Sequence, residues 1–366
     1  MERYVGLDAH SKTCVYVIQS EDGREIGEGR VPTTIEGLLS LQTRHELPAG
    51  TKVALESGTM AFFVARRLSA LGLDPVVVDA HEVRAKAVRP NQKSDRRDAR
   101  ELCEGLRRGI YRTVVHVPPE AIEQLRSTLG RRRHFVRIKT TQINAVKHLL
   151  RTVGMATTGR SLTTEKGWQK LLAAVAVDAQ LETFCRSHHA VWQCAHEQVR
   201  TLEASLESQG EPYRRDLDRL KTVPGVGSIV ALTTLAVFSD VQRFPTAKHA
   251  ASYAGLVAST YDSGESVRHG RITRRGSNEL RSMLCEAAHH AGRPGSPFHP
   301  FFTSLLVRRG YKMAVVAVAH RLCRILYAML RHGTDFEVDR LGVEEGRFEH
   351  TIVRQYRRRK LVASPA

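Results

Sequence analysis

The chain has 366 residues, enough for two or three domains, and its 42% hydrophobic content is typical of folded proteins and excludes wholesale disorder. Its formal net charge of +18 favours a polyanionic partner, nucleic acid first and an anionic membrane second, with a basic protein lacking such a partner as the alternative. No apolar leader opens the chain and its six cysteines form no C-x-x-C pair, so we expect a cytoplasmic protein with reduced thiols and no membrane partner.

The first eighty residues change from strand to helix periodicity. The segments 3–11, 13–23 and 24–31 are short runs rich in β-branched and aromatic residues, and Asp22-Gly23 favours a hairpin. A helix at 34–45, a strand at 51–58, an amphipathic helix at 60–72 and a buried strand at 74–80 follow. Periodicity alone predicts a mixed α/β domain, and three antiparallel strands followed by alternating helix and strand is the order of the ribonuclease-H-like fold.

Four carboxylates occupy positions that could converge. Asp8 lies in the first predicted strand, Glu56 ends the fourth, and Asp95 and Asp98 share one face of a predicted helix. Converging carboxylates repel one another unless a cation lies between them, and Mg²⁺ suits oxygen ligands and phosphates, as one ion or as two. The neighbouring cations Lys93, Arg96 and Arg97 would hold a nucleic-acid backbone. Each acid taken singly could instead be a helix cap, a loop residue or half of an ion pair.

The middle of the chain predicts two long helices, at 118–154 and 190–220, which suggest an antiparallel coiled coil. Arg131, Arg132 and Arg133 lie on a basic side of the first helix. This side could be a nucleic-acid stripe, part of a dimer seam or a solvated face.

The last third contains a predicted helix-hairpin-helix at 220–240, where Gly225 and Gly227 would let a phosphate approach the next helix, with a plain helix–helix turn as the alternative. A basic strand-like piece follows between two turns, and Ser263 lies in the first turn, where it is a candidate nucleophile or simply a turn residue. The cations proposed to bind nucleic acid here are Arg268, Arg271, Arg274 and Arg275.

The motifs "GLDAHS", "ALESGT" and "KSDRRDAREL", in this order, resemble the DEDD-type transposases of bacterial insertion sequences, the insertion-sequence 110 family. The resemblance implies a RuvC-like N-terminal domain in which Asp8, Glu56, Asp95 and Asp98 are catalytic and bind Mg²⁺.

The C-terminal signature of the family is matched at Gly255-Leu256, Ser263-Gly264, Gly270, Ile272, Arg274, Gly276 and Leu280-Arg281. It implies a phosphoserine intermediate, with Ser263 as the expected nucleophile and Ser259, Ser266 and Ser277 left open. The chain has "GLVAST" where the family usually has a proline, which puts the loop before Ser263 in question.

These observations predict a magnesium-dependent DNA transposase of α/β plus α class. The expected parts are a RuvC-like domain at 1–115, a helical linker for assembly at 116–218, a helix-hairpin-helix domain at 219–335 and a basic tail at 336–366. The resemblance further implies a guide RNA from the element and a dimer or tetramer. A hydrolytic junction nuclease using the same carboxylates, or a non-catalytic nucleic-acid-binding protein, are the alternatives.

Overall fold

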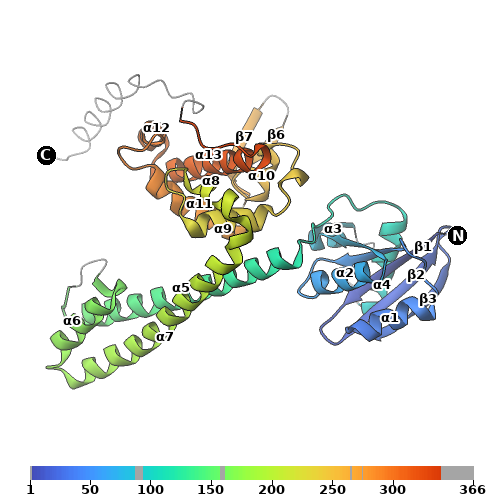
Figure 1. The fold of residues 1–366 in the computed structure, drawn as a ribbon, viewed down its shortest axis with the longest axis horizontal. Coiled ribbons are helices and arrows are strands. Elements are labelled where there is room, and N and C mark those ends of the chain that lie inside the picture. Colours follow the sequence, from blue (N-terminus) through green and yellow to red (C-terminus); the bar gives the residue numbers. More distant parts are fainter. Residues whose placement is uncertain (1, 87–93, 157–160, 264–265, 274, 339–366) are drawn as a thin grey trace. The chain divides into compact units, whose positions relative to one another are not determined.

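The computed structural model describes residues 2–86, 94–156, 161–263, 266–273 and 275–338, with the backbone alone at 260–263 and 266–269 (Figure 1). Its contacts divide the chain into two compact units, Met1–Pro119 and Glu120–Ala366. Residues 339–366 of the basic tail, Lys93 and Arg274 lie outside the described residues, so the predictions made for them stay predictions.

The first unit is built on a five-stranded mixed sheet in the order β3-β2-β1-β4-β5. The first three strands are antiparallel, and β4 and β5 continue the sheet parallel to β1, which confirms the predicted α/β character and the hairpin at Asp22-Gly23. Its elements are β1 Arg3–Ala9, β2 Thr13–Ser20, β3 Glu25–Pro32, α1 Ile35–Arg44, β4 Lys52–Glu56, α2 Ala61–Ala70, β5 Asp74–Val78, α3 Ala80–Lys86 and α4 Asp95–Arg107.

The two faces of this sheet are covered differently. Val5, Leu7, Val53 and Leu55 belong to the core cluster that also contains the buried side chains of α1 and α2. Alternate residues of a strand point to opposite faces, so Gly6 and its partner Ala54 face the other way, where α4 lies against β1, β2 and β4. The acidic residues of the candidate site share this second face.

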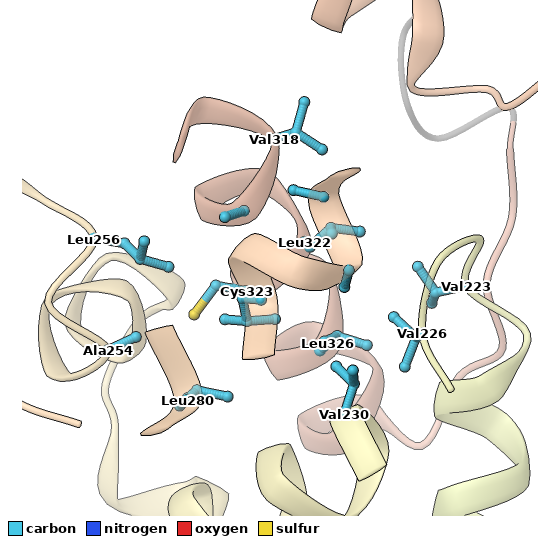
Figure 2. Packing of buried hydrophobic residues seen from close by; sticks show 14 of the residues in the cluster. Val223, Val226, Val230, Ala254, Leu256, Leu280, Val318, Leu322, Cys323 and Leu326 are labelled. Carbon is cyan, nitrogen blue, oxygen red and sulfur yellow. The ribbon is translucent and has the colours of Figure 1, made fainter. Parts of the chain in front are cut away.

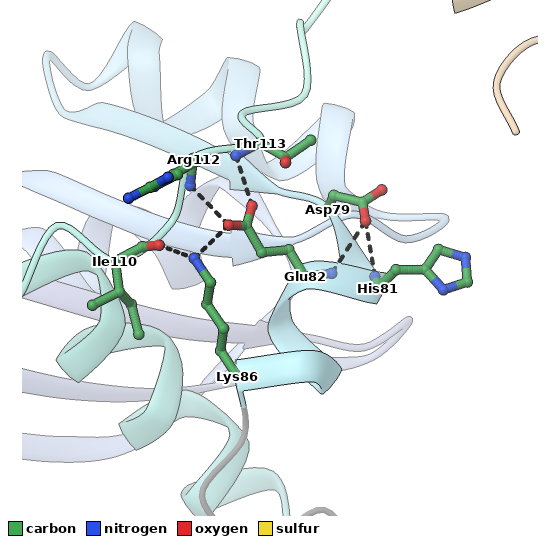
Figure 3. Close-up of polar contacts among 7 residues, drawn as sticks. All are labelled: Asp79, His81, Glu82, Lys86, Ile110, Arg112 and Thr113. Carbon is green, nitrogen blue, oxygen red and sulfur yellow. Dashed lines mark hydrogen bonds and ion pairs between the residues drawn. The ribbon is translucent and has the colours of Figure 1, made fainter. Parts of the chain in front are cut away.

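A polar cluster ties α3 to the chain that follows α4 (Figure 3). Glu82 accepts the backbone N–H of Arg112 at 2.9 Å and that of Thr113 at 2.6 Å, and Lys86 contacts both Glu82 and the carbonyl of Ile110. These bonds, led by the one from Lys86, lower the pKa of Glu82 to about 2. The cluster joins α3 to residues 110–113.

The second unit begins with the predicted pair of long helices. The elements are α5 Glu120–Thr152, α6 Glu165–Val175 and α7 Ala179–Gly210, with short 3₁₀ turns at Ser161–Thr163 and Glu211–Tyr213. Side-chain contacts between α5 and α7 pair Arg132 with Glu203 and Lys139 with His196, so that rising numbers in one helix meet falling numbers in the other. The helices are therefore antiparallel, as predicted.

The rest of the second unit is a helical bundle with one short hairpin. Its elements are α8 Arg214–Lys221, α9 Ser228–Phe238, the 3₁₀ turn Val241–Arg243, α10 Ala247–Tyr253, β6 Ala258–Ser263, β7 Ser266–Ile272, α11 Asn278–Ala291, α12 His299–Arg309 and α13 Tyr311–His332. Buried side chains of the α8–α9 turn, α11 and α13, among them Val223, Val226, Leu280 and Leu322, form its core (Figure 2). Among the described helices, α13 alone is long and apolar enough to span a membrane, yet half of that stretch is buried inside the fold.

Candidate active site and nucleic-acid interface

Gly6 determines how closely α4 approaches the sheet. A Cβ atom at this position would lie 2.0 Å from the carbonyl oxygen of Ala99 and 2.4 Å from the amide nitrogen of Cys103. Farther along the helix, the Sγ of Cys103 donates to the Tyr4 carbonyl near the start of β1. Arg107 donates to the carbonyl of Glu21, which follows the end of β2 and therefore lies beside the start of β1. The helix therefore runs antiparallel to β1, and its first turn lies at the carboxyl end of that strand.

This packing brings Asp8 and Asp95 together. Asp8 lies two residues after Gly6 on the same face of β1, and Asp95 is the first residue of α4, which is capped by the Ser94 side chain. The imidazole of His10 lies between the two acids, with its Nε2 3.0 Å from Asp8 Oδ2 and 3.5 Å from Asp95 Oδ1. One ligand atom from each of the three residues lies within 4.8 Å of the others.

Two further acids lie near this group on α4. Burial raises the pKa of Asp8, the nearby His10 opposes the rise, and the negative charges of Asp98 and Asp95 add to it. The pKa of Glu101 is likewise raised, first by burial and then by Asp98. The charge of Asp98 therefore acts on both Asp8 and Glu101.

Glu56 reaches the same face through strand register. Leu7 of β1 pairs with Leu55 of β4, so Asp8 and Glu56 each follow a paired residue on neighbouring parallel strands. The charge of Glu56 contributes, after burial and two other acids, to a pKa of about 12 for Tyr111. Neither Glu56 nor Asp98 belongs to the close group of Asp8, His10 and Asp95 in the described part of the chain.

The arginines around the acids largely pair with strand β3. Arg96 contacts Glu28, Arg100 contacts Glu25, and Arg30 approaches Asp95 at 3.7 Å. Arg97 is half-buried in the first turn of α4. The cations near the cluster therefore also hold α4 against the sheet edge, although exposed ion pairs of this kind are weak enough to exchange for phosphate.

The turn between α8 and α9 lines one side of a pocket of about 670 Å³. Gly225 adopts a φ of +87°, and a Cβ there would lie 2.5 Å from the carbonyl oxygen of Ala287, so both backbone angle and space require glycine. Gly227 has a φ of −92°, which any residue can adopt, so the backbone angle does not require glycine there. It is the N-cap residue before α9, it provides no side-chain cap, and it has open space where a Cβ would lie.

The hairpin of β6 and β7 carries the candidate nucleophile. Ser263 is the last residue of β6 and pairs with Ser266 at the start of β7, so the hairpin register places its backbone. Two of the other serines considered as the nucleophile make hydrogen bonds. Ser259 donates to the Arg271 carbonyl at 3.2 Å, and Ser277 caps α11 by accepting from the Leu280 amide. Both have structural roles.

The predicted basic contacts of the second unit have varied surroundings. Arg131 is exposed on α5, Arg132 is held by Glu203 of α7, and Arg133 lowers the pKa of Glu279, which burial raises more strongly. Arg271 is exposed in β7 and Arg275 is exposed just after it, whereas the side chain of Arg268 lies outside the described residues, as does Arg274. Of the three α5 arginines predicted to bind nucleic acid, Arg131 is therefore the one most open to a polyanion.

Two protein-family profiles match separate parts of the chain. A transposase profile of the DEDD type found in IS110 elements covers residues 5–155, and one described as "Transposase IS116/IS110/IS902 family" covers residues 217–302. The chain belongs to the IS110 family of transposases. It is an enzyme of DNA transposition or recombination, and family membership implies DNA as a partner.

Similar proteins carry the same kinds of name. The transposase is 29% identical over 297 residues to a "Probable family 20 transposase" of Pseudomonas aeruginosa, which spans 77% of this chain and 84% of that protein. It is 25% identical over 246 residues to the "Transposase for insertion sequence element IS1111A" of Coxiella burnetii, spanning 66% and 67%. It is also 34% identical over 128 residues to a "Pilin gene-inverting protein" of Moraxella lacunata, spanning 34% and 39%.

The donor set of the transposase fits a divalent cation, as the DEDD-type domain suggests. Ligands about 2.1 Å from an octahedral ion lie about 3 Å apart when they are adjacent. The 3.0 Å and 3.5 Å separations from His10 to Asp8 and Asp95 agree with this spacing. Sequence reasoning missed His10, although it stands in the "GLDAHS" motif two residues after Asp8.

Proposed function

We propose that this transposase cuts and rejoins DNA through a phosphoserine intermediate at Ser263, with Mg²⁺ held by Asp8, Glu56, Asp95 and Asp98. The convergence of Asp8 and Asp95, which are distant in the chain, carries the proposal. The order of strands in the sheet supports a ribonuclease-H-like, RuvC-like domain for residues 1–115. Sites in open α/β sheets gather at the carboxyl ends of strands, where these acids lie.

The metal would stabilise negative charge on the phosphate and on the oxygens that attack and leave. The carboxylates would bind and orient it. Burial first, and then the charges of Asp98 and Asp95, raise the pKa of Asp8, and a bound cation would offset both effects. Acids on β1, β4 and α4 are attached to rigid elements, so little reorganisation would be needed at the moment of reaction.

Ser263 would supply the nucleophile. Its Oγ attacks the phosphorus, the bond to the 3′-oxygen breaks, and the serine proton passes to that oxygen, which leaves as a hydroxyl. In the second step a 3′-hydroxyl of another strand attacks, the phosphoserine bond breaks, and the proton returns to the serine. One phosphodiester replaces another, so no nucleotide cofactor is required. Ser259 and Ser277 hold hydrogen bonds with structural roles, and Ser266 is the cross-strand partner of Ser263.

The nucleic-acid contacts of the proposal are the turn at Gly225 and Gly227, read as a helix-hairpin-helix, and the cations Lys93, Arg96, Arg97, Arg131, Arg132, Arg133, Arg268, Arg271, Arg274 and Arg275. The open start of α9 supports the first, because free helix N–H groups bind phosphate. The net charge of +18 is compatible with binding two polyanions, DNA and a guide RNA. A dimer or tetramer assembled through the helices of residues 116–218 completes the proposal.

The test is a denaturing gel of protein incubated with element-end DNA, the element's RNA and Mg²⁺. We expect a covalent protein–DNA adduct that disappears with Ser263→Ala and Asp8→Asn and persists with the matched control Ser259→Ala. Loss of the adduct with Ser266→Ala instead would reassign the nucleophile.

Two other outcomes would replace the proposal. Cleavage that survives Ser263→Ala but not Asp8→Asn would make the protein a hydrolytic nuclease. DNA binding without any cleavage, unchanged by Asp8→Asn, would leave only a binding protein.

A further inference from the structure

His10 has a backbone held in place from two sides. Its amide donates to the Thr13 carbonyl at 3.0 Å across the turn from β1 to β2. Its carbonyl accepts from the hydroxyl of Thr33 at 2.7 Å, and Thr33 is itself buried against Cys14. The imidazole therefore starts from a backbone position that two neighbouring loops determine, and it turns back over the end of β1.

The imidazole contacts acids from two different elements through one atom. Nε2 lies 3.0 Å from the Asp8 carboxylate of β1 and 3.5 Å from the Asp95 carboxylate of α4. A single N–H cannot make a well-directed hydrogen bond to both oxygens at once. A cation between the three atoms satisfies all of them together, since each then donates an electron pair to the ion.

We propose that His10 Nε2 is a ligand of the divalent cation, beside Asp8 and Asp95, and that it biases the site toward transition ions such as Mn²⁺ over Mg²⁺. This inference rests on the proposed function, because it assumes that the carboxylates bind a metal. Mg²⁺ favours oxygen ligands, whereas imidazole nitrogen binds first-row transition ions more strongly. A ligand set of two carboxylates and one imidazole therefore discriminates between ions that an all-carboxylate set treats more alike.

The alternative role for His10 is to orient Asp8 by a hydrogen bond without touching the metal. Both roles predict weaker metal binding when His10 is removed, so affinity alone does not separate them. The nuclear spin of nitrogen does separate them, because a nitrogen bonded to Mn²⁺ couples directly to the electron spin of the ion.

The experiment titrates the full-length protein with Mn²⁺ at pH 8 and records pulsed electron paramagnetic resonance spectra of the bound ion. We expect directly coordinated imidazole nitrogen in the wild type and its loss in His10→Ala. The affinity for Mn²⁺ should fall on the order of tenfold, with a smaller loss for Mg²⁺ measured by competition. His134→Ala, which removes an exposed histidine of α5, is the matched control and should change neither quantity.

A second variant covers the case in which His10→Ala does not fold. His10→Asp keeps a ligand but replaces nitrogen by oxygen, so the nitrogen coupling should vanish while the preference for Mn²⁺ over Mg²⁺ declines. Mn²⁺ that binds in an Asp8-dependent way without nitrogen coupling would overturn the role of His10 and leave the proposed function standing. Mn²⁺ binding that is unchanged in Asp8→Asn would remove the carboxylate site and both proposals with it.

Discussion

The carboxylate cluster and the serine hairpin are held by different kinds of structure. Asp8 lies in the central strand of a five-stranded sheet, and its neighbour Asp95 comes into contact through the packing of α4 on Gly6. Ser263 ends a strand in a two-stranded sheet and is placed by pairing with Ser266. The comparison teaches that the metal site depends on tertiary packing, whereas the backbone of the candidate nucleophile depends on local register.

The largest expected effect comes from breaking that packing. Gly6→Ala places a methyl group against the backbone of α4 and should destabilise the fold by about 3 kcal/mol, with loss of metal binding, because backbone cannot move aside as a side chain can. The matched change Gly130→Ala, in the exposed interior of α5 with open space around it, should stabilise by up to about 1 kcal/mol. Urea unfolding of both variants measures the difference, and equal effects would contradict the role of Gly6.

A smaller effect is expected from the serine that caps α11. Ser277→Ala removes the hydrogen bond to the Leu280 amide and should cost about 1 kcal/mol of stability. The protein–DNA adduct should still form, because the cap is structural. Urea unfolding and the adduct gel check the two parts separately, and loss of the adduct in a folded variant would make Ser277 the nucleophile.

Without a bound cation, burial and the neighbouring acids should make the charged form of Asp8 unfavourable. We expect the resulting effect on stability to be smaller than that of Ser277→Ala. The folded-state pKa of Asp8 is raised above the usual 3.8, so its contribution to stability is present below that value and is lost as pH rises through the folded pKa. Asp8→Asn should therefore raise the melting temperature of the metal-free protein at pH 7, and this gain should vanish below pH 3.8. Added Mg²⁺ should raise the melting temperature of the wild type alone; an equal rise in the variant would speak against the site.

The smallest effect is expected away from both regions, at Glu82. Its folded-state pKa of about 2 lies below the usual 4.5, so its bonds stabilise the fold above pH 4.5 and this stability is lost as pH falls through about 2. Glu82→Gln should lower the melting temperature slightly at pH 7 and not at all near pH 2. Thermal melts between pH 2 and pH 7 measure this effect, with Glu197→Gln at an exposed position of α7 as the control. A decrease in melting temperature that is the same at every pH would contradict the role of the Glu82 charge.

The sequence predicted the helices, the strands and the family, but it predicted few of the contacts between side chains. The strands at 3–9 and 52–56 and the long helices followed from hydrophobic period, because burial on one face or both imposes that period. The start of α4 was left between a catalytic and a capping role for Asp95; the cap is Ser94. The two glycines of the α8–α9 turn looked alike in the sequence, but only Gly225 has a positive φ, because a sequence shows a glycine and not its backbone angle.

The excess of positive charge by itself indicated a polyanionic partner, and the spacing of the acids indicated a possible metal site on β1, β4 and α4. The IS110 family was indicated by the resemblance of the motifs around Asp8, Glu56 and Asp95. Only the tertiary structure decided that His10 lies between Asp8 and Asp95, and that Arg96, Arg100 and Arg132 are paired with acids of other elements. Periodicity records which face of an element is buried, but the identity of the neighbour across a turn or a helix interface arises when separate segments pack together.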